Sequence, residues 1–427
     1  SQKVLLVLTG VPGAGKTLVG LSGVASLQRE FGDLSPVAFL SGNGPLVKVL
    51  QEVLVRNMKQ SETRRRAPKQ LAQRFIQEVH LYVSELLLTN NVPAERVVFY
   101  DEAQRAWSAA HNVKKKNKLP GFNDHPLLRI SEAEQLLTIA DRHSDWAIVV
   151  ALVGGGQEIH SGEAGLQAWG EAMLKFPDWR LITSPEAIVG GAGVAQQVLF
   201  ERDRPEHVES DPRLHLSVSK RSYETELHAD WVNALLVGDQ ARARSIADRS
   251  RRKVYVCRDL ETVRRWLQER GVAPYRSGLV ASSGGVRLRS QGLEPPTFTF
   301  LSGYPYEKWF LDPPERVLSS GALEVALSEF EVQGLELDYV GVCWGGDLNA
   351  SLRGWVPRKF DGRSQRWVEE ADPTKRRLTL NKYRVLLTRF RKGMVIFLPS
   401  TYRHPADHVA DDDRTARWLV GAGCVPL

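Results

Sequence analysis

A glycine-rich stretch near the start of the chain, GVPGAGKT at residues 10–17, has the spacing of a phosphate-binding loop. Glycines let backbone amides turn towards phosphate oxygens, and the start of a following helix adds its positive end. Lys16 would reach the β- and γ-phosphates and Thr17 would ligate Mg²⁺. The alternative is a chance glycine-rich turn, which the flanking apolar and helical patterns disfavour. The predicted nucleotide-binding residues are Gly10, Pro12, Gly13, Ala14, Gly15, Lys16, Thr17 and Leu18.

Two adjacent acids, Asp101 and Glu102, end the apolar run VVFYDE. Phosphoryl transfer needs an acid for Mg²⁺ and a group that positions or deprotonates the nucleophile. We therefore expect Asp101 to hold Mg²⁺, through water, and Glu102 to orient or deprotonate an attacking water. The alternative is an acid pair at a helix start, stabilised by the helix dipole.

Elements that would position these residues follow one another regularly in the first half. Predicted helices cover residues 17–29, 46–88 and 131–142. Strands and helices that alternate in this way predict a parallel α/β sheet. The predicted strands are residues 3–10, 36–42, 96–104, 146–158 and 179–186.

The chain is too long, at 427 residues, for one ordinary core, so we expect two domains. A polar stretch with prolines at 200–213 marks the boundary, which we place so that the domains are residues 1–205 and 206–427. The α/β rhythm then resumes, and 284–320 and 345–375 are predicted to be loop-rich. Predicted strands of this half are 253–258, 277–283, 338–344 and 393–399.

The stretch EFEVQGLELDYVGV at 329–342 places four carboxylates among apolar residues. Acids and apolar residues alternate there with the period of a half-buried strand, and Gly334 suggests a turn between two halves. This favours Glu329 and Glu331 as strand-edge acids. A metal site is the alternative, and Asp338 would only brace the loop.

Composition places limits on the class of protein. Apolar residues make up 42% and charged residues 25%, which are globular values. The formal charge of +7 permits a polyanionic partner. Three widely spaced cysteines favour neither a disulfide framework nor a zinc site, and indicate a reducing, cytoplasmic location. No apolar run is long enough to span a membrane. The first residue is Ser, so we expect a fused or associated upstream domain.

Five further motifs occur in the order known from superfamily 1 DNA/RNA helicases. DEAQ at 101–104 resembles their acid box, and GGGQE at 154–158 places Gln157 where they keep a glutamine that senses γ-phosphate. LSVSKRS at 216–222 resembles L-x-x-N-x-R-S, with Ser219 in place of asparagine. The final motifs are VQGLELDYV at 332–340 and YRVLLTRFRKG at 383–393. These three second-half motifs, with LSGNGPLVKVL at 40–50, are most similar to the Schlafen-like helicase group.

The resemblance implies two tandem RecA-like P-loop domains with parallel sheets and an ATP cleft between them. It implies that Arg221 and Arg389 stabilise charge in the transition state, with surface salt bridges as the alternative. Gln333 and Gly334 would face the nucleotide, and Glu336 would contact a ribose hydroxyl. The implied catalytic residues are Lys16, Asp101, Glu102, Gln157, Arg221 and Arg389.

Nucleic-acid contacts are expected in the first domain. The resemblance places Ser41, Asn43 and Gly44 where the family's first-domain motif meets a strand backbone, with a simple turn as the alternative. Lysines after Trp107 could track phosphates while the indole stacks a base, although a solvated loop is equally compatible. These lysines are Lys114, Lys115 and Lys116. Of Trp309, Trp344, Trp355 and Trp367, most would be core, and one could stack a base.

Together these features predict an ATP-dependent nucleic-acid translocase or helicase that uses Mg²⁺ and binds single-stranded DNA or RNA. Large inserted subdomains are missing, so unwinding would be modest. A nucleotide-driven switch or scaffold is the main alternative. A small-molecule P-loop kinase remains open, although it would have no use for Arg389 and a second sheet.

Overall fold

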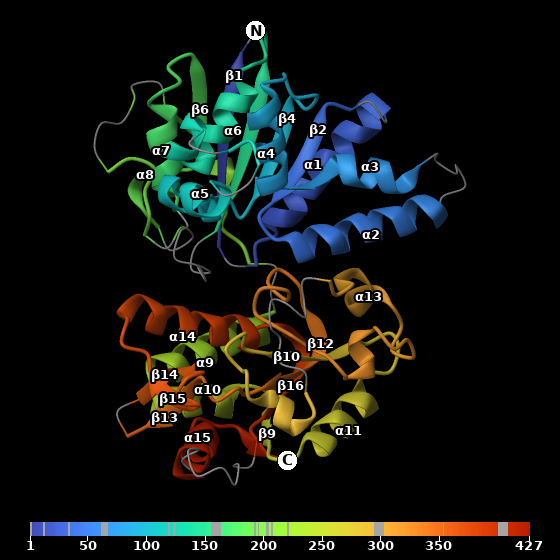
Figure 1. The fold of residues 1–427 in the computed structure, drawn as a ribbon, viewed down its shortest axis with the longest axis vertical. Coiled ribbons are helices and arrows are strands. Elements are labelled where there is room, and N and C mark those ends of the chain that lie inside the picture. Colours follow the sequence, from blue (N-terminus) through green and yellow to red (C-terminus); the bar gives the residue numbers. More distant parts are fainter. Residues whose placement is uncertain are drawn as a thin grey trace. The chain divides into compact units, whose positions relative to one another are not determined.

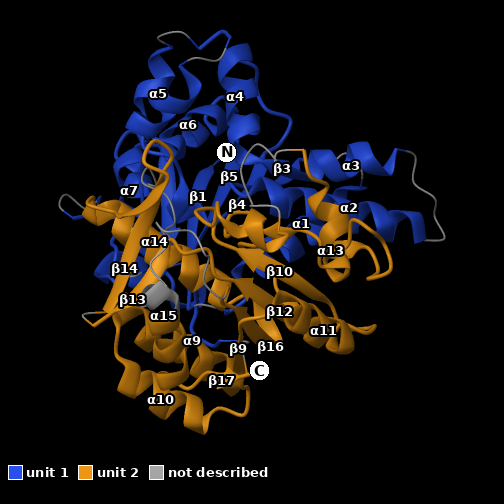
Figure 2. Cartoon of the chain, turned by 60° about the horizontal axis from the view of Figure 1, so that its bottom comes forward, with its two compact units in different colours: residues 1–220 blue, residues 221–427 orange. Residues whose placement is uncertain are grey.

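The computed structural model describes residues 2–11, 13–32, 35–60, 67–117, 120–122, 125–154, 164–191, 194, 196–201, 205, 208–219, 222–293, 303–352, 354–399 and 409–427, with backbone alone at 409–412. The chain forms two compact units, residues 1–220 and 221–427 (Figure 2). The predicted boundary at 205/206 lies earlier than this division. The difference arises because the polar stretch after residue 205 still contributes two short strands to the first sheet.

Unit 1 is built on an eight-stranded sheet in the order β3-β2-β4-β5-β1-β6-β7, with β8 beside β1. Every strand pair in it is parallel, as the alternation of elements predicts. The strands are β1 (Lys3–Gly10), β2 (Val37–Ser41), β3 (Ile76–Glu78), β4 (Val97–Asp101), β5 (Ala147–Val153), β6 (Trp179–Thr183), β7 (Val208–Ser210) and β8 (His215–Leu216).

Helices cover both faces of this sheet (Figure 1). In β2, Val37 and Phe39 belong to one apolar cluster and Ala38 and Leu40 to another, so the strand is buried on both sides. This explains the continuous apolar runs. The helices are α1 (Lys16–Phe31), α2 (Gly44–Gln60), α3 (Pro68–Phe75), α4 (Val79–Thr89), α5 (Ala109–Lys116), α6 (Glu132–Ala140), α7 (Gln167–Met173) and α8 (Pro185–Val189).

Unit 2 contains a second parallel sheet, in the order β11-β10-β12-β16-β9-β17. Its strands are β9 (Val254–Cys257), β10 (Ser277–Ala281), β11 (Ala326–Leu327), β12 (Leu337–Cys343), β16 (Phe390–Phe397) and β17 (Val425–Pro426). Its helices are α9 (Tyr223–Val237), α10 (Gln240–Arg249), α11 (Leu260–Arg270), α13 (Tyr306–Leu311), α14 (Pro373–Leu387) and α15 (Val409–Gly421). Two parallel sheets with mixed helices confirm the predicted α/β class and are consistent with two tandem RecA-like domains.

An antiparallel sheet in unit 2 was not predicted. It consists of β13 (Leu348–Ser351), β14 (Gly354–Asp361) and β15 (Arg366–Glu369), which occupy much of the stretch predicted to be loop-rich. Figure 2 shows β14 as a long strand at the margin of this unit. The glycines and turn residues that favoured a loop lie where the strands begin and turn.

The predicted strand at the start of EFEVQGLELDYVGV was wrong. Residues 328–336 form successive turns between β11 and β12, in which the amides of Glu331 and Val332 both donate to the Ser328 carbonyl, each at 3.1 Å. Glu329 is fully buried and accepts from the Ser283 amide at 2.8 Å. Glu331 accepts from the Ser328 amide at 2.9 Å. The alternation of acids and apolar residues wrongly indicated a half-buried strand, because these acids bond to backbone amides inside the protein instead of facing solvent.

Candidate functional site

The phosphate loop joins β1 to α1 at the carboxyl edge of the unit 1 sheet. Gly13 and Gly15 have φ values of 77° and 93°, in the left-handed region that only glycine adopts at little cost. The Ala14 amide donates to the Val11 carbonyl at 3.1 Å, which closes the turn. The Val11 amide donates to the Leu216 carbonyl of β8 at 3.1 Å. The turn leads directly into α1, so the amino terminus of this helix lies at the loop, where it can bind an anion.

Lys16 lies folded back over the loop. Its ammonium donates to the Gly10 carbonyl at 2.9 Å. The end of its side chain also packs against Gly154, directly after β5, where an added Cβ would lie 2.9 Å from the Lys16 Cε. A glycine at position 154 therefore keeps open the space that the lysine occupies.

The Thr17 hydroxyl meets the Asp101 carboxylate. Its Oγ1 donates to Oδ2 at 2.9 Å, with Oδ1 at 3.2 Å. Asp101 ends β4 and is 2% exposed. Burial, and then repulsion from Glu102, raise the pKa of Asp101 to about 7. Oxygen atoms are the ligands that Mg²⁺ prefers, and the structure brings these two groups together from segments 84 residues apart.

Glu102 is held by a residue that was not predicted. The Gln104 amide nitrogen donates to a Glu102 carboxylate oxygen, and its carbonyl oxygen accepts from the Gly154 amide at 3.0 Å. Glu102 itself has φ 54°, an unusual left-handed conformation for a residue with a side chain. Gln104 thus links the acid pair to the end of β5. The DEAQ motif contained this signal, because Gln104 is its final residue.

Both the nucleotide and Mg²⁺ fit the residues present. The two glycines adopt left-handed conformations, the Lys16 ammonium bonds to a carbonyl oxygen of the loop, and the Thr17 and Asp101 oxygens converge. Leu18 is 67% exposed on the first turn of α1. Pro12, Gln157 and Arg221, three further predicted site residues, lie outside the described residues.

In unit 2, the turn before β12 carries the predicted ribose and nucleotide contacts. Gly334 is exposed and has φ 80°, which this turn requires. Gln333 is buried, with 3% exposed. Glu336 pairs with Arg391, whose Nε lies 3.4 Å from its Oε2. Asp338 accepts from the Arg276 amide at 2.9 Å, which joins the start of β12 to the residue before β10.

Arg389 is buried between α14 and β16, with 5% exposed. Its Nε donates to the Val385 carbonyl at 3.1 Å and its terminal nitrogen donates to the Thr388 hydroxyl at 3.0 Å. The guanidinium is therefore bonded to the carboxyl end of the preceding helix, α14, in this structure. Its predicted catalytic role stays a prediction.

The predicted first-domain strand contact is a helix cap. The Asn43 side chain accepts from the Leu46 amide at 3.1 Å at the start of α2, and Ser41 accepts from the Asn43 amide at 3.2 Å. Ser41 is fully buried, whereas Asn43 and Gly44 are half-buried. Phosphate contact here would depend on Asn43 and the exposed Gly42 rather than on the Ser41 hydroxyl.

The three lysines of α5 differ in position. Lys114 and Lys115 are exposed, but Lys116 is 2% exposed and its ammonium finds no hydrogen-bond partner among the described residues. It lies 5.6 Å from the Trp107 ring centre, and burial lowers its pKa. His80 stacks on Trp107 at 3.7 Å. Lys116 is therefore unsuited to phosphate contact, and the Trp107 ring is already covered.

Glu132 joins these elements and was not predicted. This fully buried carboxylate accepts from Tyr100 at 2.9 Å and from the Trp107 amide at 3.2 Å, and lies 2.6 Å from His80 Nδ1. Burial alone would raise the pKa of Glu132, but the interactions with His80, Lys116 and Tyr100 outweigh it and lower the pKa. An acid at a helix start gives no sequence signal for such a role, because the dipole explains it equally well.

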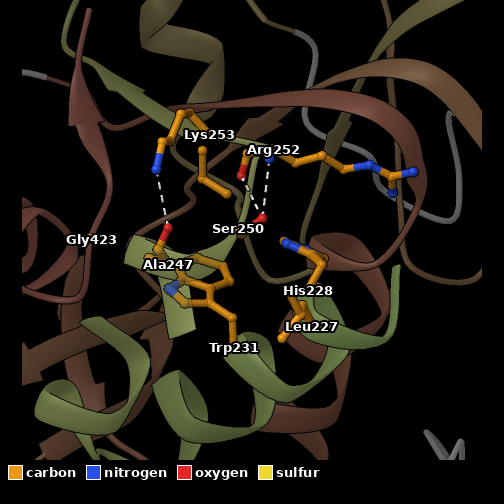
Figure 3. A pocket seen from close by; sticks show the side chains of 9 residues that line it. Leu227, His228, Trp231, Ala247, Ser250, Arg252, Lys253 and Gly423 are labelled. Atoms are coloured by element: carbon orange, nitrogen blue, oxygen red, sulfur yellow. Dashed lines mark hydrogen bonds between the residues drawn. The ribbon is translucent and has the colours of Figure 1, made fainter. Parts of the chain in front are cut away.

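A small pocket of unit 2 lies at the contact of α9, α10 and β9 (Figure 3). Lys253 donates to the Ala247 carbonyl at 3.2 Å, and the Ser250 hydroxyl bonds to the backbone of Arg252. His228 lies 2.7 Å from the Leu387 carbonyl. Since its polar side chains bond to surrounding backbone and side chains, we assign no ligand to this pocket.

A family model matches residues 3–400, and its description is Schlafen group 3, DNA/RNA helicase domain. The chain belongs to the Schlafen group 3 helicase-domain family. The match covers every strand of both parallel sheets except β17, which confirms the predicted Schlafen-like resemblance. Membership makes the chain helicase-like and nucleotide-binding in character.

No curated protein matches the chain in sequence. None of the helices within the described ranges is long and apolar enough to cross a membrane.

Proposed function

We propose that this Schlafen group 3 domain is an ATP-driven translocase or helicase that acts on single-stranded DNA or RNA. The observation that carries the proposal is the convergence of Lys16, Thr17 and Asp101 at one edge of a parallel sheet, in a chain of a helicase family. Parallel sheets bind ligands outside the carboxyl ends of their strands, where these residues lie.

Bound Mg²⁺ would neutralise charge on the phosphate oxygens. Lys16 would exchange its bond to the Gly10 carbonyl for phosphate oxygens, and Thr17 would turn its hydroxyl oxygen to the metal. Glu102, held by Gln104, would orient the attacking water and accept its proton. Because Gln104 also accepts from the Gly154 amide, the position of this base depends on the end of β5.

Residues of unit 2 would supply the remaining contacts. We infer that Gln333, Gly334 and Glu336 contact the nucleotide, and that Arg389, with Arg221, stabilises transition-state charge. Such a role would require Arg389 to leave its bonds to Val385 and Thr388. The proposed first-domain contacts to the nucleic acid are Asn43 and Gly44 with the exposed Gly42 beside them, and Lys114 and Lys115.

The second candidate is a nucleotide-driven switch with slow hydrolysis. The buried, internally bonded Arg389 favours it, because an arginine in that state would not reach a phosphate. A switch would bind ATP without stimulation by nucleic acid. The kinase alternative finds no support in a family match that spans both units.

The deciding experiment is ATP hydrolysis by the full chain, measured with and without single- and double-stranded DNA and RNA. A translocase predicts stimulation by a single strand that weakens as salt rises. Hydrolysis that no nucleic acid stimulates would favour the switch. Absence of both nucleic-acid binding and nucleotide hydrolysis at low salt would reject the translocase.

A further inference from the structure

The antiparallel sheet of unit 2 belongs to neither parallel sheet, and β15 lies at its edge. We call β14, β15 and the turn between them the ribbon, residues 354–369. Strand pairing places Phe360 opposite Trp367 and Asp361 opposite Arg366. Because successive side chains of a strand point to opposite faces, Phe360 and Trp367 share one face of the ribbon and Arg366 lies on the other.

The aromatic face is supported from behind. Trp367 packs on Gly346, where an added Cβ would lie 3.3 Å from the ring, and its ring centre lies 5.5 Å from that of Phe360. The Arg287 guanidinium lies over Phe360 at 5.6 Å. Both rings remain partly exposed. The other three tryptophans singled out in the sequence are core residues, namely Trp309, Trp344 and Trp355.

Further cationic side chains lie at the turn of the ribbon and on the face opposite these rings. The turn between the strands is held by Asp361, which accepts from the amides of Arg363 and Ser364, both at 3.2 Å, and from the Ser364 hydroxyl at 2.6 Å. These bonds lower the pKa of Asp361 and occupy its carboxylate. Arg363 and Arg366 are exposed, and Lys359 lies 3.9 Å from Glu370 while remaining mostly exposed.

Charged residues at a sheet edge can simply prevent pairing with another chain. That explanation accounts for Arg366 at the edge strand. It does not account for Phe360 and Trp367, which pack together and remain partly exposed on the opposite face of the ribbon. Bases stack on such rings irrespective of sequence, while arginines nearby contact phosphates.

We propose that the edge of the ribbon is an additional contact site for single-stranded nucleic acid. A strand that follows β15 would stack a base on Trp367 at one face and place phosphates beside Arg366 at the other and Arg363 at the turn. Glu369, on the aromatic face, lies opposite Arg358, which balances its charge. The inference rests on the proposed nucleic-acid function and adds a site that the helicase motifs do not contain.

The first test removes the ribbon's charges. In the full chain, the pair Arg363→Gln and Arg366→Gln is compared with Arg242→Gln and Arg249→Gln, which lose the same charge from exposed positions on α10. Binding of labelled oligo(dT) and oligo(U) is measured over a salt series. We expect the ribbon variant alone to bind more weakly, with a salt slope smaller by about 0.7 for each lost phosphate contact.

The second test removes the aromatic platform. Trp367→Leu should weaken binding of both oligonucleotides about fivefold or more, because stacking of one base contributes about 1 kcal/mol or more. Trp367→Phe, which keeps a ring, should restore most of the affinity. Urea unfolding of each variant verifies that the chain is folded under the binding conditions.

The outcomes separate this inference from the proposed function. If the unaltered chain binds the oligonucleotides but the ribbon and α10 variants lose affinity equally, or not at all, the ribbon is no contact site and the proposed function stands. If Trp367→Leu and Trp367→Phe behave alike, stacking is rejected. If the unaltered chain binds neither oligonucleotide at low salt, the proposed function itself fails.

Discussion

Thr17 and Asp101 are hydrogen-bonded across 2.9 Å at the start of α1 and the end of β4. Each residue is therefore positioned by the other before any ligand binds. Thr17→Val should abolish the dependence of nucleotide binding on Mg²⁺, because it removes a ligand oxygen and leaves a buried carboxylate without its donor. Thr17→Ser keeps the oxygen and should behave almost normally. Titration of fluorescent ATP with and without Mg²⁺ tests this, and equal Mg²⁺ dependence in both variants would contradict it.

Glu102→Gln should bind ATP normally but hydrolyse it about 100-fold more slowly or worse, because an amide accepts no proton from water. Gln104→Leu should reduce turnover less, since it releases Glu102 without removing its carboxylate. Binding and single-turnover hydrolysis, measured separately, give the comparison. Full turnover by Glu102→Gln would assign the base to another residue.

Gly154→Ala should weaken ATP binding, because the new methyl would lie 2.9 Å from the Lys16 Cε and displace the ammonium. The stability cost should be small, since the far end of a flexible side chain can move. Gly303→Ala, at a position with nothing within 4 Å, serves as the control. Calorimetric ATP binding and thermal unfolding are the measurements. Unchanged affinity in Gly154→Ala would show that Lys16 tolerates the methyl group.

The three lysines of α5 should differ in their effect on nucleic-acid binding. Lys114→Gln with Lys115→Gln should weaken binding of a single strand and lower its salt dependence, because both side chains are exposed. Lys116→Met should leave binding unchanged and should not reduce stability, because it removes a buried ammonium that has no hydrogen-bond partner in the described structure. Loss of nucleic-acid binding in Lys116→Met, with stability intact, would refute this assignment.

His228 should make stability fall in acid. It is buried beside the Leu387 carbonyl, and burial lowers its pKa from 6.5 to about 4. The unfolded chain therefore binds the proton more readily, so stability is complete above pH 6.5 and is lost as the pH falls towards 4. The loss attributable to this residue is on the order of 3 kcal/mol.

Chemical unfolding of the unaltered chain and of His228→Gln between pH 4 and 7 tests this expectation. The glutamine can still donate to Leu387 but does not titrate. Its free energy of unfolding should change less with pH than that of the unaltered chain. Parallel pH profiles would contradict the assignment.

Local sequence patterns predicted most strands of the two parallel sheets, because strands buried on both faces produce apolar runs. The GVPGAGKT motif also indicated the strand before it and the helix after it. The short strand β3 was missed within a stretch predicted as helical, since three residues carry no period. Turns that contain buried acids, such as Glu329, can have the same alternating sequence pattern as a half-buried strand. Gln104 and Glu132 were missed as site residues because their partners, Gly154 and His80, are distant in sequence.

The bond between Val11 and Leu216 ties the entrance of the phosphate loop to the peptide that leaves the first unit. Leu216 precedes the division at 220/221 by only a few residues. If the loop shifts when a phosphate binds, this bond would transmit the shift directly to Leu216 and the residues that follow it. No change in the packing of the core would be needed. Slowed hydrogen exchange at the Val11 amide on ATP addition would report this mechanical connection.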